Sequence, residues 1–208
     1  PATHTTPDAL ELHRVMRDMV DAGCRYLFME VSSHALVQQR VYGLPFALAL
    51  FTNLTRDHLD YHGTMQAYIA AKKLLFDNLS PDAYALVNAD DRNGSVMVQN
   101  CVAHLHTYAM RSHADYMSQL LGQYVDGSTL LLDNEEVEIK LVGSYNAYNV
   151  TAVYGVARLL LPDLDKSLIL RGISSLEHVN GRFDLLASPR GYHVVVDYAH
   201  TPDALENL

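Results

Sequence analysis

The chain has 208 residues, of which 49% are hydrophobic and 19% charged, with a formal net charge of −9. This composition is typical of a globular protein, whereas an acidic balance without a Lys/Arg stripe argues against nucleic-acid binding, and no run approaches the roughly 20 apolar residues of a membrane span. Two isolated cysteines, Cys24 and Cys101, and the lack of a signal-peptide pattern lead us to expect a protein of the reducing cytoplasm.

The N-terminal half alternates predicted helices with predicted strands. Thr6 as cap, Pro7 at the first helical position and Asp8 beside it predict a helix that Gly23 ends. Short apolar runs at 26–31 and 46–51 predict two buried strands. A helix over 64–78 and a strand over 84–87 follow. This alternation predicts an α/β fold whose mostly parallel sheet is flanked by helices.

The C-terminal half begins with a small antiparallel β excursion, predicted over 105–142 with turns at 126–127 and 133–134. Helices are expected at 147–160 and 164–176, followed by a connector at 177–182. Two further strands are expected at 183–186 and 193–196.

Polar clusters follow two of the predicted strands, at 30–34 and at 52–58. Ligands of parallel sheets collect at the carboxyl ends of the strands. We therefore expect a binding site there.

Lys72 lies on the apolar face of the helix predicted over 64–78. Burial disfavours the ammonium form, and a neutral amine can react with carbon dioxide to give a carbamate. Alternatively, the stem of Lys72 crosses the core and brings the ammonium group to solvent.

Other polar residues each have two interpretations. His58 and His62 have the i, i+4 spacing of a zinc site but no evident third ligand, and Asp57 can simply cap a helix. Mg²⁺ suits the segment better because it needs only one or two protein ligands beside phosphate oxygens. Glu30 either pairs with a base or binds a metal. Asn146 and Asn149, one turn apart at a helix start, either contact a purine edge or act as caps.

Four blocks, in order and with matching spacing, resemble the MurE type of the Mur ligase family over essentially the whole chain. They occupy residues 5–8, 29–36, 51–63 and 195–203. The Glu-Val-Ser-Ser-His and Asp-Tyr-Ala-His-Thr-Pro stretches separate this type from its sister ligases. The resemblance implies a P-loop-type central domain over 1–178, truncated at its N-terminus, and the start of a C-terminal domain over 179–208.

The resemblance also implies roles position by position. Residues that match those holding the UDP-N-acetylmuramoyl dipeptide are Thr5, Thr6, Ser32, Gln38 and Arg40. Lys72 matches the carbamylated lysine, and with Glu30 and His58 it forms the implied catalytic and Mg²⁺-binding set. The implied ATP-binding residues are Asn146, Asn149, Arg182 and Asp197.

The implied reaction belongs to peptidoglycan biosynthesis and uses ATP and Mg²⁺. A D-glutamyl carboxylate attacks the γ-phosphate of ATP, and the amine of a diamino acid displaces phosphate from the acyl phosphate. The diamino acid is meso-diaminopimelate or L-lysine, and we expect a monomeric enzyme. Because no G-x-x-x-x-G-K-[ST] loop occurs in these residues, we expect this stretch alone to be inactive.

Two alternatives stay open at this point. Another ligase of the superfamily, such as a folylpolyglutamate synthetase, shares the ATPase core but not the Thr-Thr-Pro and Ser-Ser-His stretches. The other alternative is a non-catalytic binding module of the same fold. Its distinguishing sign would be a parent reading frame without a phosphate-binding loop.

Overall fold

The computed structural model describes residues 5–55, 59–177, 181, 183–199 and 205–206. Its main sheet has the strand order β1-β2-β3-β4-β5-β6, and β7 pairs with β8 in a second sheet. β1 (Leu48–Phe51), β2 (Tyr84–Asn88) and β3 (His104–Ala109) are parallel neighbours. The α/β fold with a mostly parallel sheet is thereby confirmed.

The antiparallel part of the main sheet consists of β4 (Tyr116–Gln123), β5 (Ser128–Leu132) and β6 (Glu135–Ile139). β4 begins in parallel register beside the end of β3. Asp133 and Asn134 both have positive φ, as a tight two-residue hairpin requires. The excursion predicted over 105–142 was too long at its start. β3 is parallel to β2 because a crossover containing α5 (Gly94–Met97) returns the chain to the same edge.

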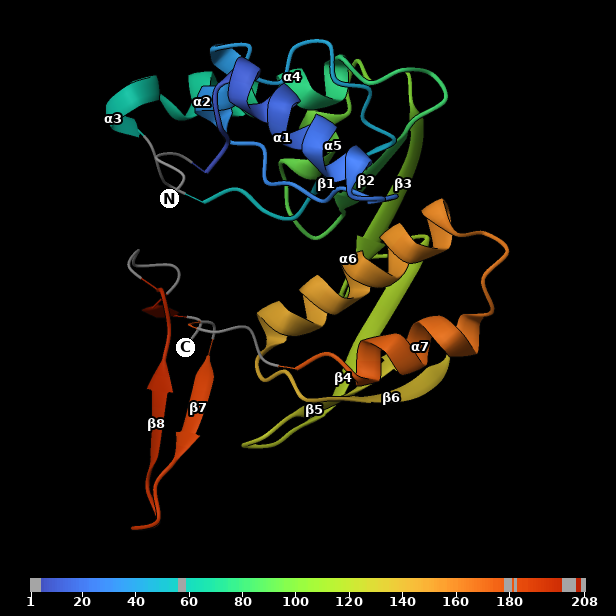
Figure 1. Cartoon of the computed structure of the whole chain (residues 1–208). Coiled ribbons are helices and arrows are strands. Elements are labelled where there is room, and N and C mark those ends of the chain that lie inside the picture. The colour runs from blue at the N-terminus through green and yellow to red at the C-terminus, as the bar shows by residue number, and fades with distance from the viewer. Residues whose placement is uncertain (1–4, 56–58, 178–180, 182, 200–204, 207–208) are drawn as a thin grey trace.

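Helices cover both faces of the parallel strands (Figure 1). On one face, α4 (Met65–Asp77) and α5 pack against Phe51 and Val87. On the other, α6 (Ser144–Leu160) packs against Leu86 and Tyr108. Adjacent residues of β2 thus face opposite layers, as the two-residue period of a strand requires.

α1 (Ala9–Asp21) begins two residues later than the sequence suggested. Its N-cap is Asp8, whose side chain accepts hydrogen bonds from the N–H groups of Leu10 and Glu11. The prediction of Thr6 as cap and Pro7 as first helical residue was wrong, because the Thr6 hydroxyl binds the backbone of Glu30 and Ser32 instead. Past the helix end, Gly23 has φ +83°, as predicted for the residue that stops the helix.

The strand predicted over 26–31 is not a strand. The segment is extended and irregular, and the Phe28 side chain is 75% exposed. A strand needs a neighbouring backbone to pair with, and this segment has no ladder partner among the residues that the structure describes. It leads into α2 (Ser33–Val37), which Ser32 caps. The strand predicted from residue 46 begins at Leu48.

The remaining predicted elements are present. α6 and α7 (Lys166–Ser174) match the two expected helices, and β7 (Asp184–Ala187) and β8 (His193–Val196) match the two expected strands. The short helix α3 (Leu59–His62) was not predicted. No helix in the described part of the chain is long and apolar enough to cross a membrane.

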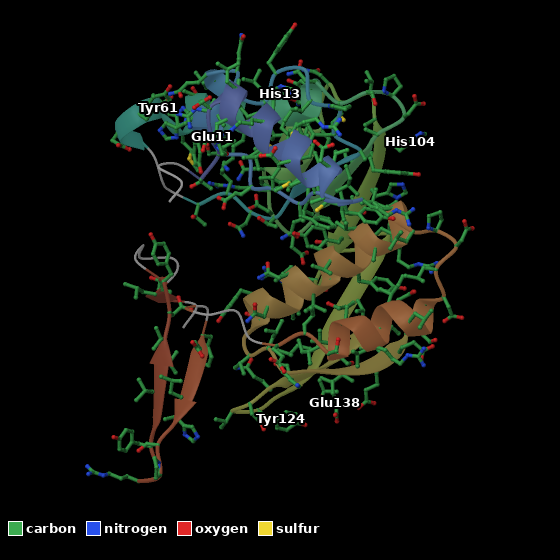
Figure 2. The ribbon with its side chains drawn as sticks, in the orientation of Figure 1. Glu11, His13, Tyr61, His104, Tyr124 and Glu138 are labelled. Carbon is green, nitrogen blue, oxygen red and sulfur yellow. The ribbon has the colours of Figure 1, made fainter. Side chains whose placement is uncertain are left out.

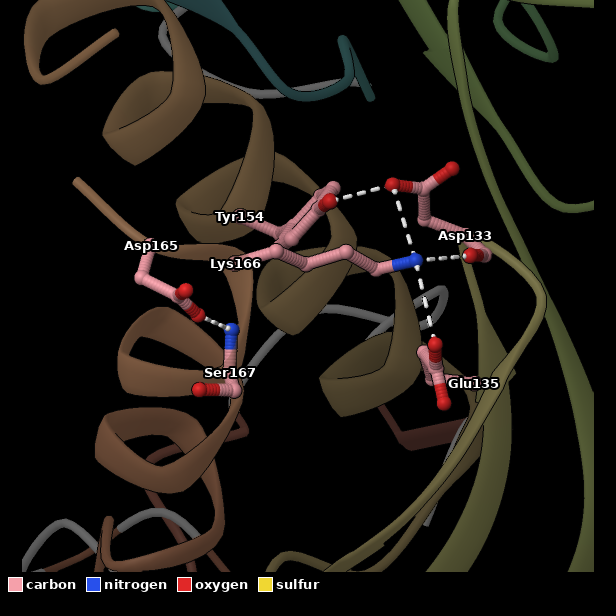
Figure 3. A network of polar contacts seen from close by, with 6 residues as sticks. All are labelled: Asp133, Glu135, Tyr154, Asp165, Lys166 and Ser167. Carbon is pink, nitrogen blue, oxygen red and sulfur yellow. Dashed lines mark hydrogen bonds and ion pairs between the residues drawn. The ribbon is translucent and has the colours of Figure 1, made fainter. Parts of the chain in front are cut away.

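A polar network joins the helical layer to the β5–β6 hairpin (Figure 3). Lys166 Nζ donates to the carbonyl of Asp133 at 2.5 Å and forms ion pairs with the carboxylates of Asp133 and Glu135. The Tyr154 hydroxyl donates to the same Asp133 carboxylate. Residues of α6, α7 and the hairpin therefore meet at Asp133.

Candidate functional site

Thr6 connects the start of α1 to the segment before α2. Its side chain is fully buried; Oγ1 donates to the Glu30 carbonyl at 2.9 Å and accepts from the Ser32 N–H at 3.1 Å. Ser32 Oγ in turn accepts from the Ala35 N–H. The hydroxyl of Thr6 thus fixes the backbone on both sides of Val31.

Arg40 forms hydrogen bonds with two of the other predicted substrate-binding residues, Thr6 and Gln38. Its Nη1 donates to the Thr6 carbonyl at 2.8 Å, while Nε and Nη2 donate to Gln38 Oε1 at 2.9 and 2.6 Å. Gln38 Nε2 donates to the hydroxyl of Tyr61, a residue of α3 that Figure 2 labels. Thr6, Ser32, Gln38 and Arg40 therefore lie in one hydrogen-bonded group, with the exposed Thr5 next to Thr6 in the chain.

A cluster of rings lies beside this group. His62 Nε2 is 2.8 Å from Ser33 Oγ, and the His62 ring stacks on Tyr68 with centroids 5.2 Å apart. His34 packs on Tyr61. Lys72 is half-buried, with Nζ 5.3 Å from the centroid of the Tyr68 ring. The cluster therefore brings α2, α3 and α4 together next to Lys72.

Sequence reasoning assigned no role to the rings of this cluster other than His62. The i, i+4 spacing of Tyr68 and Lys72 on one helix is a local signal that predicts their contact. The contacts of α2 with α3 join residues far apart in the chain and leave no such signal.

The predicted Mg²⁺ set is only partly visible, since His58 lies outside the described residues, as does the proposed Asp57 cap. Glu30 has an exposed side chain and a carbonyl fixed by Thr6. Within the described ranges, no group of three or more His, Cys, Asp or Glu side chains could hold a metal. Glu30 together with a carbamate on Lys72 would supply the oxygen ligands that Mg²⁺ prefers; the donor chemistry fits that ion.

The carboxyl ends of β1 and β2 are tied together by side chains that sequence reasoning missed. Asn88 Nδ2 donates to the Thr52 carbonyl at 2.9 Å, and Asp91 Oδ2 accepts from the Leu54 N–H at 3.0 Å. Polar residues directly after a strand were the available signal. These contacts fix the start of the polar segment that follows β1.

The predicted nucleotide side lies at the N-terminal end of α6. Asn146 is buried, and its amide donates to the Val142 carbonyl at 2.8 Å, so it binds the backbone just before α6. The exposed Asn149 donates to Asn146 Oδ1 at 3.4 Å. Tyr148 reaches the carboxyl end of β2, where its hydroxyl donates to Asp90 at 2.8 Å. This end of α6 therefore lies at the carboxyl edge of the sheet.

Asp90 organises the loop after β3. It accepts from the Met110, Arg111 and Ser112 N–H groups at 2.8, 2.9 and 2.7 Å. Burial alone would raise the pKa of Asp90, but its hydrogen bonds hold that pKa well below the usual range. The carboxylate is therefore ionised at neutral pH.

Of the two remaining predicted ATP-binding residues, Arg182 lies outside the described residues. Asp197 accepts from the Phe183 and Ala199 N–H groups, both at 2.7 Å. Asp197 thus ties the start of β7 to the end of β8, and the structure does not bring it together with α6.

Residues 1–157 match the family model described as Mur ligase middle domain. The chain belongs to the Mur ligase family. This Mur ligase chain is 51% identical over 208 residues to the UDP-N-acetylmuramoyl-L-alanyl-D-glutamate–2,6-diaminopimelate ligase of Phocaeicola vulgatus, covering 100% of this chain and 43% of the relative. The ligase of the same name from Cytophaga hutchinsonii is 50% identical over 207 residues, with 100% and 42% coverage. The chain thus spans about two fifths of the length of the curated relatives it matches.

Solved structures agree with this assignment. A structure of a UDP-N-acetylmuramoyl-L-alanyl-D-glutamate–2,6-diaminopimelate ligase superposes with a TM-score of 0.79 at 33% identity, covering 97% of this chain and 42% of that one. The MurF ligase of Thermotoga maritima in complex with ADP has a TM-score of 0.73 at 18% identity, with 100% and 48% coverage. The second likeness shows the Mur ligase fold alone.

Proposed function

We propose that the chain is the central part of a cytoplasmic, monomeric ligase that uses ATP and Mg²⁺ to join diaminopimelate to UDP-N-acetylmuramoyl-L-alanyl-D-glutamate. The relatives that share about half of its residues carry the name of this activity. Residues 1–178 would form most of the ATPase domain, and 179–208 would begin the C-terminal domain. The observation that carries the proposal is the hydrogen-bonded group of Thr6, Ser32, Gln38 and Arg40 beside Lys72.

Arg40 has donors available for an anionic substrate. A guanidinium carries five N–H donors, and the contacts to Thr6 and Gln38 engage Nε and one N–H on each terminal nitrogen. The remaining donors can bind a carboxylate or phosphate of the dipeptide substrate, while the existing bonds keep the fork in place. The exposed hydroxyl of Thr5 would add a further contact.

Lys72, Glu30 and His58 would form the metal-binding part of the site. When bound, Mg²⁺ supplies positive charge that offsets the charge on the transferred phosphoryl group. Carbamylation would convert Lys72 from a half-buried cation into an anion with two oxygen ligands. The ring cluster of His62 and Tyr68 holds the helix face that carries Lys72.

Titration of UDP-N-acetylmuramoyl-L-alanyl-D-glutamate into the full-length protein tests the substrate assignment. Arg40→Gln should raise the dissociation constant roughly tenfold or more, because a charge-assisted hydrogen bond is lost. The matched control is Arg14→Gln, which removes an exposed arginine of α1 and should leave the affinity unchanged. Wild-type affinity in a folded Arg40→Gln protein would refute the assignment.

A further inference from the structure

Arg111 follows β3 at the carboxyl edge of the sheet and has no role in the site described so far. Its backbone N–H donates to Asp90 at 2.9 Å, and its Nε donates to the Tyr148 hydroxyl at 3.1 Å. The same hydroxyl donates to Asp90 at 2.8 Å. Asp90 and Tyr148 therefore hold Arg111 by its main chain and its side chain together.

The terminal nitrogens of this guanidinium remain available. Throughout the described part of the chain, Nε is the only side-chain nitrogen of Arg111 with a hydrogen-bond partner. Arg111 is exposed, and an arginine stays charged at any physiological pH. A positioned cation whose N–H groups face no protein acceptor can bind an anion without first breaking internal bonds.

The position of Arg111 indicates which anion it meets. Tyr148, its side-chain partner, lies between Asn146 and Asn149 on the first turns of α6. That end of α6 stands at the carboxyl edge of the sheet, where ligands of parallel sheets bind. The chain as a whole is acidic, with a net charge of −9, so a polyanion must be bound by local cations.

We propose that Arg111 is a nucleotide-binding residue that donates hydrogen bonds to a phosphate oxygen of ATP. The planar fork of an arginine matches a phosphate group. Tyr148 and Asp90 act as positioning residues, because they fix the guanidinium and the backbone beneath it. This inference rests on the proposed ATP-dependent function and names a residue that the resemblance did not supply.

Calorimetric titration of the full-length protein with ATP and, separately, with adenosine tests the inference. Arg111→Gln should weaken ATP binding roughly tenfold and leave adenosine binding unchanged, because only the phosphates lose a charge-assisted partner. Arg111→Lys should lose less ATP affinity than Arg111→Gln, since it keeps the positive charge. Tyr148→Phe should also lose less ATP affinity than Arg111→Gln, since it frees the guanidinium of Arg111 but does not remove it.

Arg171→Gln is the matched control, because it removes an exposed arginine of α7 and should not change either affinity. Unchanged ATP affinity in Arg111→Gln would overturn the inference, and so would an equal loss for adenosine. A wild-type protein that binds no ATP would instead refute the proposed function. Arg111 is exposed, so thermal unfolding of Arg111→Gln should match that of the wild type.

Discussion

Lys72 shows how far a single residue could be interpreted from its spacing. The helical period placed it on the apolar face of α4, and in the structure the residue is half-buried with Nζ 5.3 Å from the centroid of the Tyr68 ring. Neighbouring Lys73 pairs with Asp77 one turn along the same helix. Two adjacent lysines thus provide a test of carbamylation and its control.

Carbon-13 NMR of the full-length protein in labelled bicarbonate should show a carbamate signal. Lys72→Ala should abolish that signal and the ligase activity, because the proposed Mg²⁺ ligand is then absent. Lys73→Ala should keep both the carbamate signal and the activity. Its only expected cost is to stability, through the loss of one i, i+4 ion pair worth about 0.3–0.5 kcal/mol. A carbamate signal that persists in Lys72→Ala, or is absent from the wild type, would contradict the assignment.

At the residue scale, the resemblance selected Thr6, Gln38 and Arg40, which the structure brings together, but it did not indicate how they are held. Thr6, Gln38 and Arg40 were assigned to substrate from the resemblance, and their hydrogen bonds to one another came only from the structure. Asp91 was missed altogether. Its contact with Leu54 spans 37 residues, and such a separation leaves no periodic pattern in the chain.

At the scale of elements, α6 packs closely on the sheet at Gly155. A Cβ there would lie 2.9 Å from Cδ2 of Tyr116 and 3.0 Å from Cδ2 of Leu86, closer than carbon atoms normally approach. Gly155 thus permits the contact of α6 with β2 and β4, a contact on which the position of Asn146 and Tyr148 depends.

Gly155→Val should lower the free energy of unfolding by about 1–3 kcal/mol, because overpacking forces the helix away from the sheet. The matched control is Gly172→Ala in α7, where an added Cβ meets nothing within 4 Å. That substitution should raise stability by about 0.5–1 kcal/mol through helix propensity. Urea unfolding of both variants measures the difference, and equal stability of Gly155→Val and the wild type would contradict the packing argument.

Elements with strong local signals were predicted well. α4 begins after its N-cap Thr64 and ends before Asn78, close to the bounds that its apolar period predicted. The strand prediction for residues 26–31 was wrong because an apolar run predicts burial, whereas a strand also needs a partner backbone. For β3 only the predicted direction was wrong, because its direction relative to β2 depends on a crossover that local sequence does not specify.

At the scale of the whole molecule, the residues proposed for the site form two hydrogen-bonded groups on different elements. The group of Thr6 and Arg40 lies with α1 and α2, while Asn149, Tyr148 and Arg111 lie with α6 and the end of β3. The chain spans about two fifths of its curated relatives. Activity is therefore a property to be measured on the full-length protein.

The most direct test of the account is the mass of the product that the full-length protein forms. With ATP, Mg²⁺, UDP-N-acetylmuramoyl-L-alanyl-D-glutamate and both diamino acids present, the account predicts a nucleotide product extended by diaminopimelate, with one ADP and one phosphate released per product. Omitting the dipeptide substrate should abolish phosphate release. Extension by L-lysine alone, or no extension by a folded protein that binds ATP, would contradict the account.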